Sequence, residues 1–408
     1  MGKKVFSLCM ALALCLGLLP VTALAVEGAP NSLYVGDQQV IKGDNPTFWT
    51  TDESTGGLTE YKGNDDNWNV KYDPNTATLT LNGATIQGGT NTGPAPFGSG
   101  IYALCSSNQS VALTIELIGT NTITGYYGIY VNAEMSANSY GTDASLTITG
   151  ENNGSLKVSG SYHGIYVKSG SGDASLNIKN VAVTSSTNGN YAAGVYVMSS
   201  PFATDSPNIS LSVDGGSLTA SGTGSNDGIL FYVGLSQATG ATTRLTVSEN
   251  AIVDARNGGI SALRISETLP TPTPTGDNRS GIVFDGSTGT VYGDVTLDES
   301  LTINQGETLT IPEGSTLNSN GNLTNKGTIL ASGGTLEGTL SNGTRPTTPN
   351  ITEQPYDYTV TEGEDATFTV EASAWSETLT YQWQQSTDNG SSWTNIESET
   401  NASYTINS

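Results

Sequence analysis

The chain has 408 residues, and its 38 acidic residues against 14 basic ones give a formal net charge of −24. This excess of negative charge argues against nucleic acid as a partner, because phosphate binding needs clustered Lys and Arg. Only 13% of the residues are charged and 50 are glycine, so most of the surface must consist of small neutral groups; about 25% charge is usual in globular proteins.

The N-terminus has the pattern of a secretory signal peptide. Two lysines precede an apolar run from Val5 to Leu19, and small residues follow up to Ala25. The run is too short to span a bilayer, so we predict cleavage after Ala25, a secreted or cell-surface location and no transmembrane segment. Loss of residues 1–25 leaves Cys105 as the only thiol, which excludes an internal disulfide.

Residues 26–75 lack the repeat that follows them and contain Trp49 and Trp68. A solenoid needs an atypical first segment to close its exposed end. We therefore predict an N-terminal cap over 26–75.

From residue 76 to 268 one phrase recurs, a leucine, a polar residue and a second aliphatic residue. The leucines are 30 to 35 residues apart, at Leu79, Leu113, Leu146, Leu176, Leu211 and Leu245. Alternation within each copy predicts strands whose aliphatic residues point inward, and the near-constant period predicts one coil of a solenoid per copy. Three strand candidates per coil predict a parallel β-helix, right-handed by the general crossover preference.

A second phrase, Gly-Ile-Tyr-Val or a close variant, occurs once per coil and supplies the candidate ligand-binding residues. Its tyrosine should point outward, since the flanking aliphatic residues point inward. Further aromatic residues lie nearby, so the candidates are Tyr102, Tyr126, Tyr130, Tyr162, His163, Tyr166, Tyr191 and Tyr196. Stacked tyrosines with solvated hydroxyl edges suit the apolar faces of sugar rings, and the alternative is that they only stabilise the coils.

Two aspartates, Asp143 and Asp173, repeat one coil apart in the phrase Asp-Ala-Ser-Leu. Adjacent carboxylates could share a calcium ion, the one cofactor that we consider. The alternative is that each carboxylate accepts backbone hydrogen bonds in a turn. Asp65-Asp66 in a Gly-Asn-rich loop is a second, weaker calcium candidate.

After residue 268 the pattern changes. We predict a Pro/Thr loop over 269–279, because proline cannot join a ladder, and shorter triangular coils of the same solenoid over 280–343. A linker over 344–352 leads to a different module at 353–408.

The C-terminal module contains a Tyr-x-Trp strand around Trp383, an Asp-Asn-Gly turn and a Trp-Thr-x-Ile strand with Trp393 and Ile396. It resembles bacterial immunoglobulin-like domains of surface proteins. The resemblance implies that the remaining strands, with a later tyrosine, follow Ser408. The predicted fold is thus all-β, a right-handed parallel β-helix with a C-terminal partial immunoglobulin-like β-sandwich.

The stretch from Trp68 to Ile86, together with the Gly-Ile-Tyr-Val phrases and Gly289-Thr-Val-Tyr-Gly293, resembles the β-helix modules of large Gram-positive surface proteins that are grouped with carbohydrate-binding domains. The resemblance covers roughly 33–340 and implies binding of polysaccharide or of a host or matrix glycan, in some members an acidic polysaccharide with calcium.

We therefore predict a non-catalytic surface protein that binds polysaccharide or mediates adhesion. A structural stalk that presents other modules is the first alternative. A polysaccharide lyase or glycoside hydrolase is the second alternative. Against it, no two acids are adjacent in the outward column that follows the leucine phrase, Asn82, Glu116, Thr149, Lys179, Asp214 and Ser248, and His163 has no carboxylate close in sequence.

Overall fold

The computed structural model describes residues 28–63, 66–88, 98–105, 108–133, 142–150, 154–200, 206–224, 226–235, 238–265, 267–276, 278–343, 350–373 and 379–407. The predicted signal peptide, Asp65 and most of the predicted linker lie outside these residues. Every regular element among the described residues is a β-strand. None of the described residues belongs to a helix that is long and apolar enough to cross a membrane.

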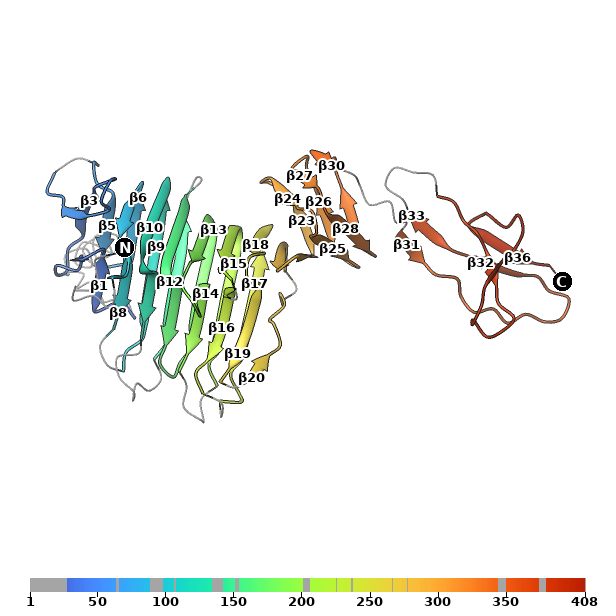
Figure 1. Ribbon diagram of the computed structural model, residues 1–408, viewed down its shortest axis with the longest axis horizontal. Helices are drawn as coiled ribbons and strands as arrows, with labels where there is room; N and C mark the ends of the chain where they lie inside the picture. Colours follow the sequence, from blue (N-terminus) through green and yellow to red (C-terminus); the bar gives the residue numbers. More distant parts are fainter. Residues whose placement is uncertain are drawn as a thin grey trace, which may run out of the picture.

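The main body is a parallel β-solenoid of about five turns, seen in Figure 1 as the long series of aligned strands from β6 to β19. Each coil contributes one strand to each of three sheets. The first sheet contains β6 (Thr78–Asn82), β9 (Val111–Ile118), β11 (Ala144–Gly150), the first halves of β13 (Ala174–Thr187) and β15 (Asn208–Ser221), and β17 (Thr242–Ser248).

The other two sheets complete each coil. The second contains β7 (Thr85–Gln87), the first halves of β10 (Thr120–Asn132) and β12 (Ser155–Ser169), the second halves of β13 and β15, and β18 (Ala251–Ala255). The third contains β8 (Ile101–Leu104), the second halves of β10 and β12, β14 (Ala193–Ser199), β16 (Asp227–Val233) and β19 (Ile260–Arg264).

The inward columns are those predicted from the alternation. The repeated leucines and the aliphatic residues two positions later are almost fully buried in one continuous core. Stacking of like aliphatic side chains every coil, about 4.8 Å apart, supplies the burial that a disulfide-free solenoid depends on.

The register of the first coil differs from our expectation. Leu79 lies opposite Ile115 rather than Leu113, and Thr80 lies opposite Glu116. The strand has moved by two residues, which leaves its inward side chains inward because side chains alternate with period two. The Thr80 hydroxyl consequently donates to Glu116 Oε2 at 3.1 Å.

Antiparallel strands cover the open edge of the first coil. These strands are β1 (Ser32–Val35), β2 (Gln38–Gln39), β3 (Thr47–Thr51), β4 (Leu58–Glu60) and β5 (Val70–Asp73). Strand β1 pairs with β8 and β5 pairs with β6, both antiparallel. Trp49 is buried in the main core. These strands satisfy the backbone groups that the terminal coil would expose.

A strand shared by two cores joins the main solenoid to a second, narrower stack. Strand β21 (Gly281–Asp285) pairs parallel with β18 and antiparallel with β22 (Thr288–Tyr292). Val283 belongs to the main core, whereas Ile282 and Phe284 belong to a separate core. The narrower coils thus pack on the opposite face of this sheet and have a core of their own. We had expected them to continue the core of the main solenoid.

The narrower stack also consists of three-stranded coils. It contains β23 (Asp294–Thr296), β24 (Leu301–Ile303), β25 (Thr308–Pro312), β26 (Thr316–Asn318), β27 (Leu323–Asn325), β28 (Thr328–Ser332), β29 (Thr335–Glu337) and β30 (Asn342–Gly343). The first, fourth and seventh of these pair in parallel, as do β24, β27 and β30, and β22, β25 and β28. Before this stack, β20 (Glu267–Leu269) pairs antiparallel with β19 and covers the last edge of the third sheet.

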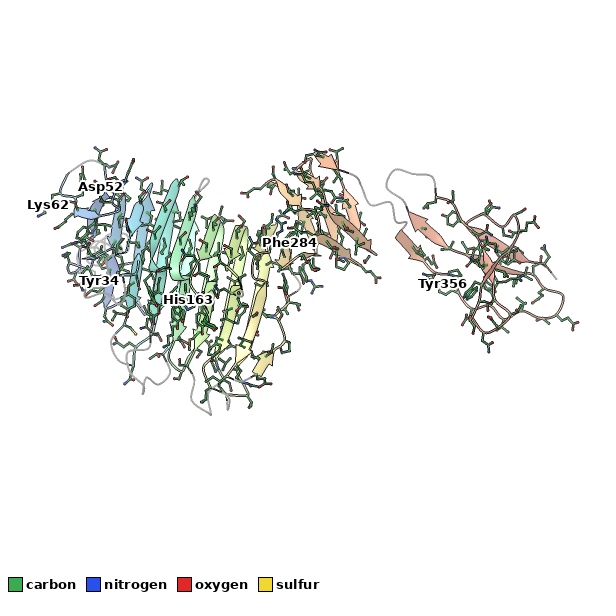
Figure 2. All side chains as sticks on the ribbon, in the orientation of Figure 1. Tyr34, Asp52, Lys62, His163, Phe284 and Tyr356 are labelled. Atoms are coloured by element: carbon green, nitrogen blue, oxygen red, sulfur yellow. The ribbon has the colours of Figure 1, made fainter. Side chains whose placement is uncertain are left out.

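Arg256 links the two stacks. Its guanidinium lies 3.3 Å from Asp254 on its own coil and 3.3 Å from Glu307 of the narrower stack. It also donates to the Thr302 carbonyl at 3.0 Å, and its Cζ lies 3.8 Å from the centre of the Phe284 ring; Phe284 is labelled at this junction in Figure 2. One largely buried cation therefore fixes the orientation of the second stack on the first.

Small antiparallel sheets form the C-terminal module, consistent with a β-sandwich. They comprise β31 (Asn350–Glu353), β32 (Ala366–Thr369), β33 (Glu371–Ser373), β34 (Gln384–Gln385), β35 (Thr394–Asn395) and β36 (Ser403–Ile406). Trp383 packs against Phe368 and Tyr404, with ring centres 6.5 and 5.9 Å away. Tyr404 belongs to β36, which pairs antiparallel with β32; the immunoglobulin-like assignment, with further strands after Ser408, stays a prediction.

Candidate functional site

The four tyrosines of the Gly-Ile-Tyr-Val phrase form one column on the outer face of the third sheet. Tyr102, Tyr130, Tyr166 and Tyr196 lie opposite one another on successive coils. The Tyr130 and Tyr166 rings are 4.6 Å apart and nearly parallel, as are those of Tyr166 and Tyr196 at 4.8 Å. We call these four residues the inner column.

The inner column is more buried than we expected from its outward direction. Tyr102, Tyr130 and Tyr166 expose only 4, 8 and 7% of their surfaces. The Tyr102 hydroxyl accepts a hydrogen bond from Asn132, and the Tyr166 hydroxyl donates one to the Met198 sulfur. Their faces are occupied by neighbouring rings, so these residues do not offer the open platform with solvated hydroxyl edges that we predicted.

A second row of rings packs along the inner column. Tyr127 lies opposite His163, just after a β-bulge between Gly125 and Tyr127. The Tyr127 ring is 4.8 Å from that of Tyr130, and the His163 ring is 4.7 Å from that of Tyr196. Burial raises the pKa of Tyr127 to about 12, so its phenol stays neutral. Tyr127 is not among the residues predicted from the sequence, although its place beside Tyr126 is a signal.

His163 is a buried, neutral part of this row. Only 2% of its surface is exposed, and its Nδ1 accepts the Ala193 backbone N–H at 3.0 Å. Its ring is surrounded by those of Tyr127, Tyr162, Tyr166 and Tyr196, and Figure 2 places it in the middle of the main solenoid. Burial lowers its pKa from 6.5 to about 4, because loss of hydration disfavours the charged imidazolium.

The remaining candidates lie at the bend between the second and third sheets. We call Tyr126, Tyr162 and Tyr191 the aromatic corner. Tyr126 and Tyr162 are partly exposed and stack with ring centres 5.5 Å apart. Tyr191 lies on the following coil, in a loop whose Gly189 backbone approaches Tyr162. The three residues of the aromatic corner thus lie on successive coils. Tyr126 and Tyr162 also contact the second row, with ring centres 5.0 Å from Tyr127 and 4.2 Å from His163, respectively.

Tyr191 combines an exposed ring with an unfavourable backbone conformation. Its side chain is 91% exposed and its φ is 55°, in the left-handed region that bulky residues rarely adopt. The next two residues hold the loop, since Ala192 N–H donates to Asn226 and Ala193 N–H donates to His163. Asn226 also donates to the Gly189 carbonyl. A fixed loop thus presents one ring fully to solvent at a conformational cost.

The two candidate calcium ligands belong to a ladder of turn hydrogen bonds. Asp143 Oδ1 accepts the Asp173 backbone N–H at 2.8 Å, and Asp173 Oδ1 accepts the Asn208 N–H at 2.7 Å. On the coil before them Ser110 Oγ accepts the Asp143 backbone N–H, and on the coil after them Asn208 Oδ1 accepts the Thr242 hydroxyl. Asp143 and Asp173 lie on successive coils, and each carboxylate uses an oxygen on the backbone of the next coil.

The described part of the chain contains no group of three or more His, Cys, Asp or Glu side chains placed to hold a metal ion. Asp66 is exposed, and its neighbour Asp65 lies outside the described residues. Asp143 and Asp173 therefore accept backbone hydrogen bonds, as the alternative to a calcium site supposes. Calcium binding by these two residues stays a prediction.

Fold and site together define an all-β solenoid with a buried aromatic column and an exposed aromatic corner. The chain matches no protein-family model, no curated protein sequence and no solved structure.

Proposed function

We propose that the chain is a secreted or cell-surface, non-catalytic solenoid that binds polysaccharide, or adheres to a glycan surface, through the aromatic corner. The observation that carries the proposal is Tyr191, an aromatic ring that is 91% exposed on a left-handed backbone. A folded chain gains nothing in packing from such a ring, whereas a sugar ring can stack on it.

The surroundings of Tyr191 support a sugar as ligand. Asn188 and Asn190 on the same loop are exposed, and their amides can donate and accept hydrogen bonds with sugar hydroxyls. Tyr162 on the preceding coil adds a partly exposed ring edge. The resemblance to β-helix modules of Gram-positive surface proteins favours the same ligand class.

The corner offers little for bond cleavage. Residues 124–128, 159–164 and 186–194 contain no Asp or Glu, and a glycosidase of the usual kind needs two carboxylates. His163, the only histidine, is buried and accepts a backbone N–H. A binding role therefore fits these residues better than hydrolysis or elimination.

A structural stalk is the second candidate. The two solenoid stacks and the C-terminal module follow one another along the long axis of the molecule (Figure 1), and Arg256 fixes the first junction. A stiff, elongated arrangement suits the presentation of other modules away from a surface.

The test is affinity electrophoresis of the full chain in gels that contain single polysaccharides. We expect retardation by at least one polysaccharide, loss of it in Tyr191→Ala and retention in Tyr191→Phe. Tyr356→Ala is the matched control, because Tyr356 is 67% exposed but belongs to the C-terminal module. Retardation that survives in Tyr191→Ala, or disappears equally in Tyr356→Ala, would refute the aromatic corner as the site, and no retardation in any gel would favour the stalk.

A further inference from the structure

Resting on the proposed function, we infer that the ligand of the aromatic corner is an uncharged glycan chain that runs along the solenoid axis across successive coils. Three features of the aromatic corner support this ligand: its charge, the position of the charged side chains on the same strands and the spacing of its rings. It departs from the acidic ligand that the family resemblance implies.

The corner is neutral although the chain as a whole is strongly acidic. Segments 124–128, 159–164 and 186–194, which form the bend on three successive coils, contain Thr, Ser, Gly, Asn, Ala and Tyr with one histidine. That histidine, His163, is neutral because burial lowers its pKa to about 4. The following coil adds one carboxyl, Asp227 opposite Ala193, which accepts a hydrogen bond from Ser261 and whose pKa is raised by burial. The three segments therefore offer no cation to pair with an anionic ligand.

The nearest charged residues on the same strands are two lysines. Lys157 lies five residues before Tyr162, and Lys168 lies five residues after His163, both on β12. Five residues of extended strand span roughly 16 Å, about twice the distance over which exposed charges interact at physiological ionic strength. The lysines therefore add little attraction for an acidic sugar bound at the corner.

The rings are arranged along the axis rather than along the strands. Tyr126 and Tyr162 lie on neighbouring coils and stack with an interplanar angle of 20°, so their faces are turned toward each other and the pair extends along the axis. The loop that carries Tyr191 is on the coil after Tyr162, as the hydrogen bond from Thr187 to the Tyr162 carbonyl indicates. Two coil steps span about 10 Å, which is longer than one sugar ring and favours a chain of several units.

Exposed amides and hydroxyls line the same path. Asn188 and Asn190 flank Tyr191, and Ser161 precedes Tyr162; all three side chains are exposed. Neutral donors and acceptors pair with sugar hydroxyls without the desolvation cost of a charge. An uncharged chain lying across three coils would meet one such group on the second coil and two on the third.

The test measures binding of the full chain to neutral polysaccharides (a soluble β-glucan, a galactomannan and a xylan) and to polygalacturonate, by affinity electrophoresis at low and high salt and with EDTA. We expect a neutral polysaccharide to retard the chain, and this retardation should change less than about twofold with salt and not at all with EDTA. It should fall about tenfold or more in Tyr191→Ala and stay unchanged in Lys157→Gln.

The outcomes separate this inference from the proposed function. Retardation by polygalacturonate alone, weakened by salt, by EDTA or by Lys157→Gln but still dependent on Tyr191, would overturn the uncharged ligand and leave glycan binding at the corner intact. Absence of retardation in every gel would overturn both. In competition experiments, a monosaccharide that displaces the polysaccharide as well as a hexasaccharide does would refute the placement along the axis.

Discussion

Acid should weaken the fold through His163, and the size of the effect follows from its surroundings. The folded pKa is about 4 against 6.5 for a free histidine. Above pH 6.5 His163 is neutral in both the folded and the unfolded chain. Between pH 6.5 and about 4 only the unfolded chain takes up a proton, so the free energy of unfolding falls as the pH falls. The total loss is roughly 3 kcal/mol, because one pKa unit corresponds to about 1.4 kcal/mol.

The measurement compares urea unfolding of the wild type and His163→Asn at a series of pH values. The asparagine Oδ1 lies one bond from Cγ, as Nδ1 does, and can still accept the Ala193 N–H. It does not titrate, so the variant should lack this part of the pH dependence. The carboxylates titrate equally in both proteins and cancel in the comparison. If wild type and variant lose stability in parallel from pH 6.5 to about 4, the account of His163 as a buried neutral acceptor is wrong.

Three further substitutions test the structural roles of other residues. Tyr166→Ala should lower the free energy of unfolding by about 3–5 kcal/mol, whereas Tyr166→Phe should cost about 1 kcal/mol, since the ring stays between its neighbours; equal losses in urea unfolding would contradict the stack. Asp173→Ala should lower the free energy of unfolding by about 1–2 kcal/mol, and Asp173→Asn should retain most of the stability. A urea midpoint that rises with calcium in the wild type alone would favour a metal site over the ladder of turn hydrogen bonds. Arg256→Met should cost about 3 kcal/mol because Asp254 and Glu307 lose their partner, and limited proteolysis should then cleave between the two stacks; an unchanged digestion pattern would refute the link.

Much of the solenoid could be predicted from its periods. The leucine column and the alternation around it place the core correctly, and the register of the tyrosine column from Tyr102 to Tyr196 is confirmed. The shift of Leu79 against Ile115 could not be read from the sequence, because a two-residue slip preserves the inward face and leaves the pattern unchanged.

The burial of the inner column depends on a feature that alternation does not encode. A β-bulge after Gly125 turns Tyr127 onto the column, and His163 follows it on the next coil. Likewise, the left-handed conformation of Tyr191 is set by hydrogen bonds from Ala192 and Ala193 to side chains on the neighbouring coils. The sequence therefore identified the aromatic residues as a group, and tertiary contacts divided them into a buried column and an exposed corner.

The most direct test of the central claim is a paired measurement on Tyr191→Asn. Asparagine tolerates the left-handed backbone that tyrosine adopts at a cost, and it removes the ring. We expect the variant to unfold at the same or a higher urea concentration than the wild type and to lose retardation by the polysaccharide that the wild type binds. A variant that is less stable, or that still binds, would contradict the view that this ring is held out for a ligand.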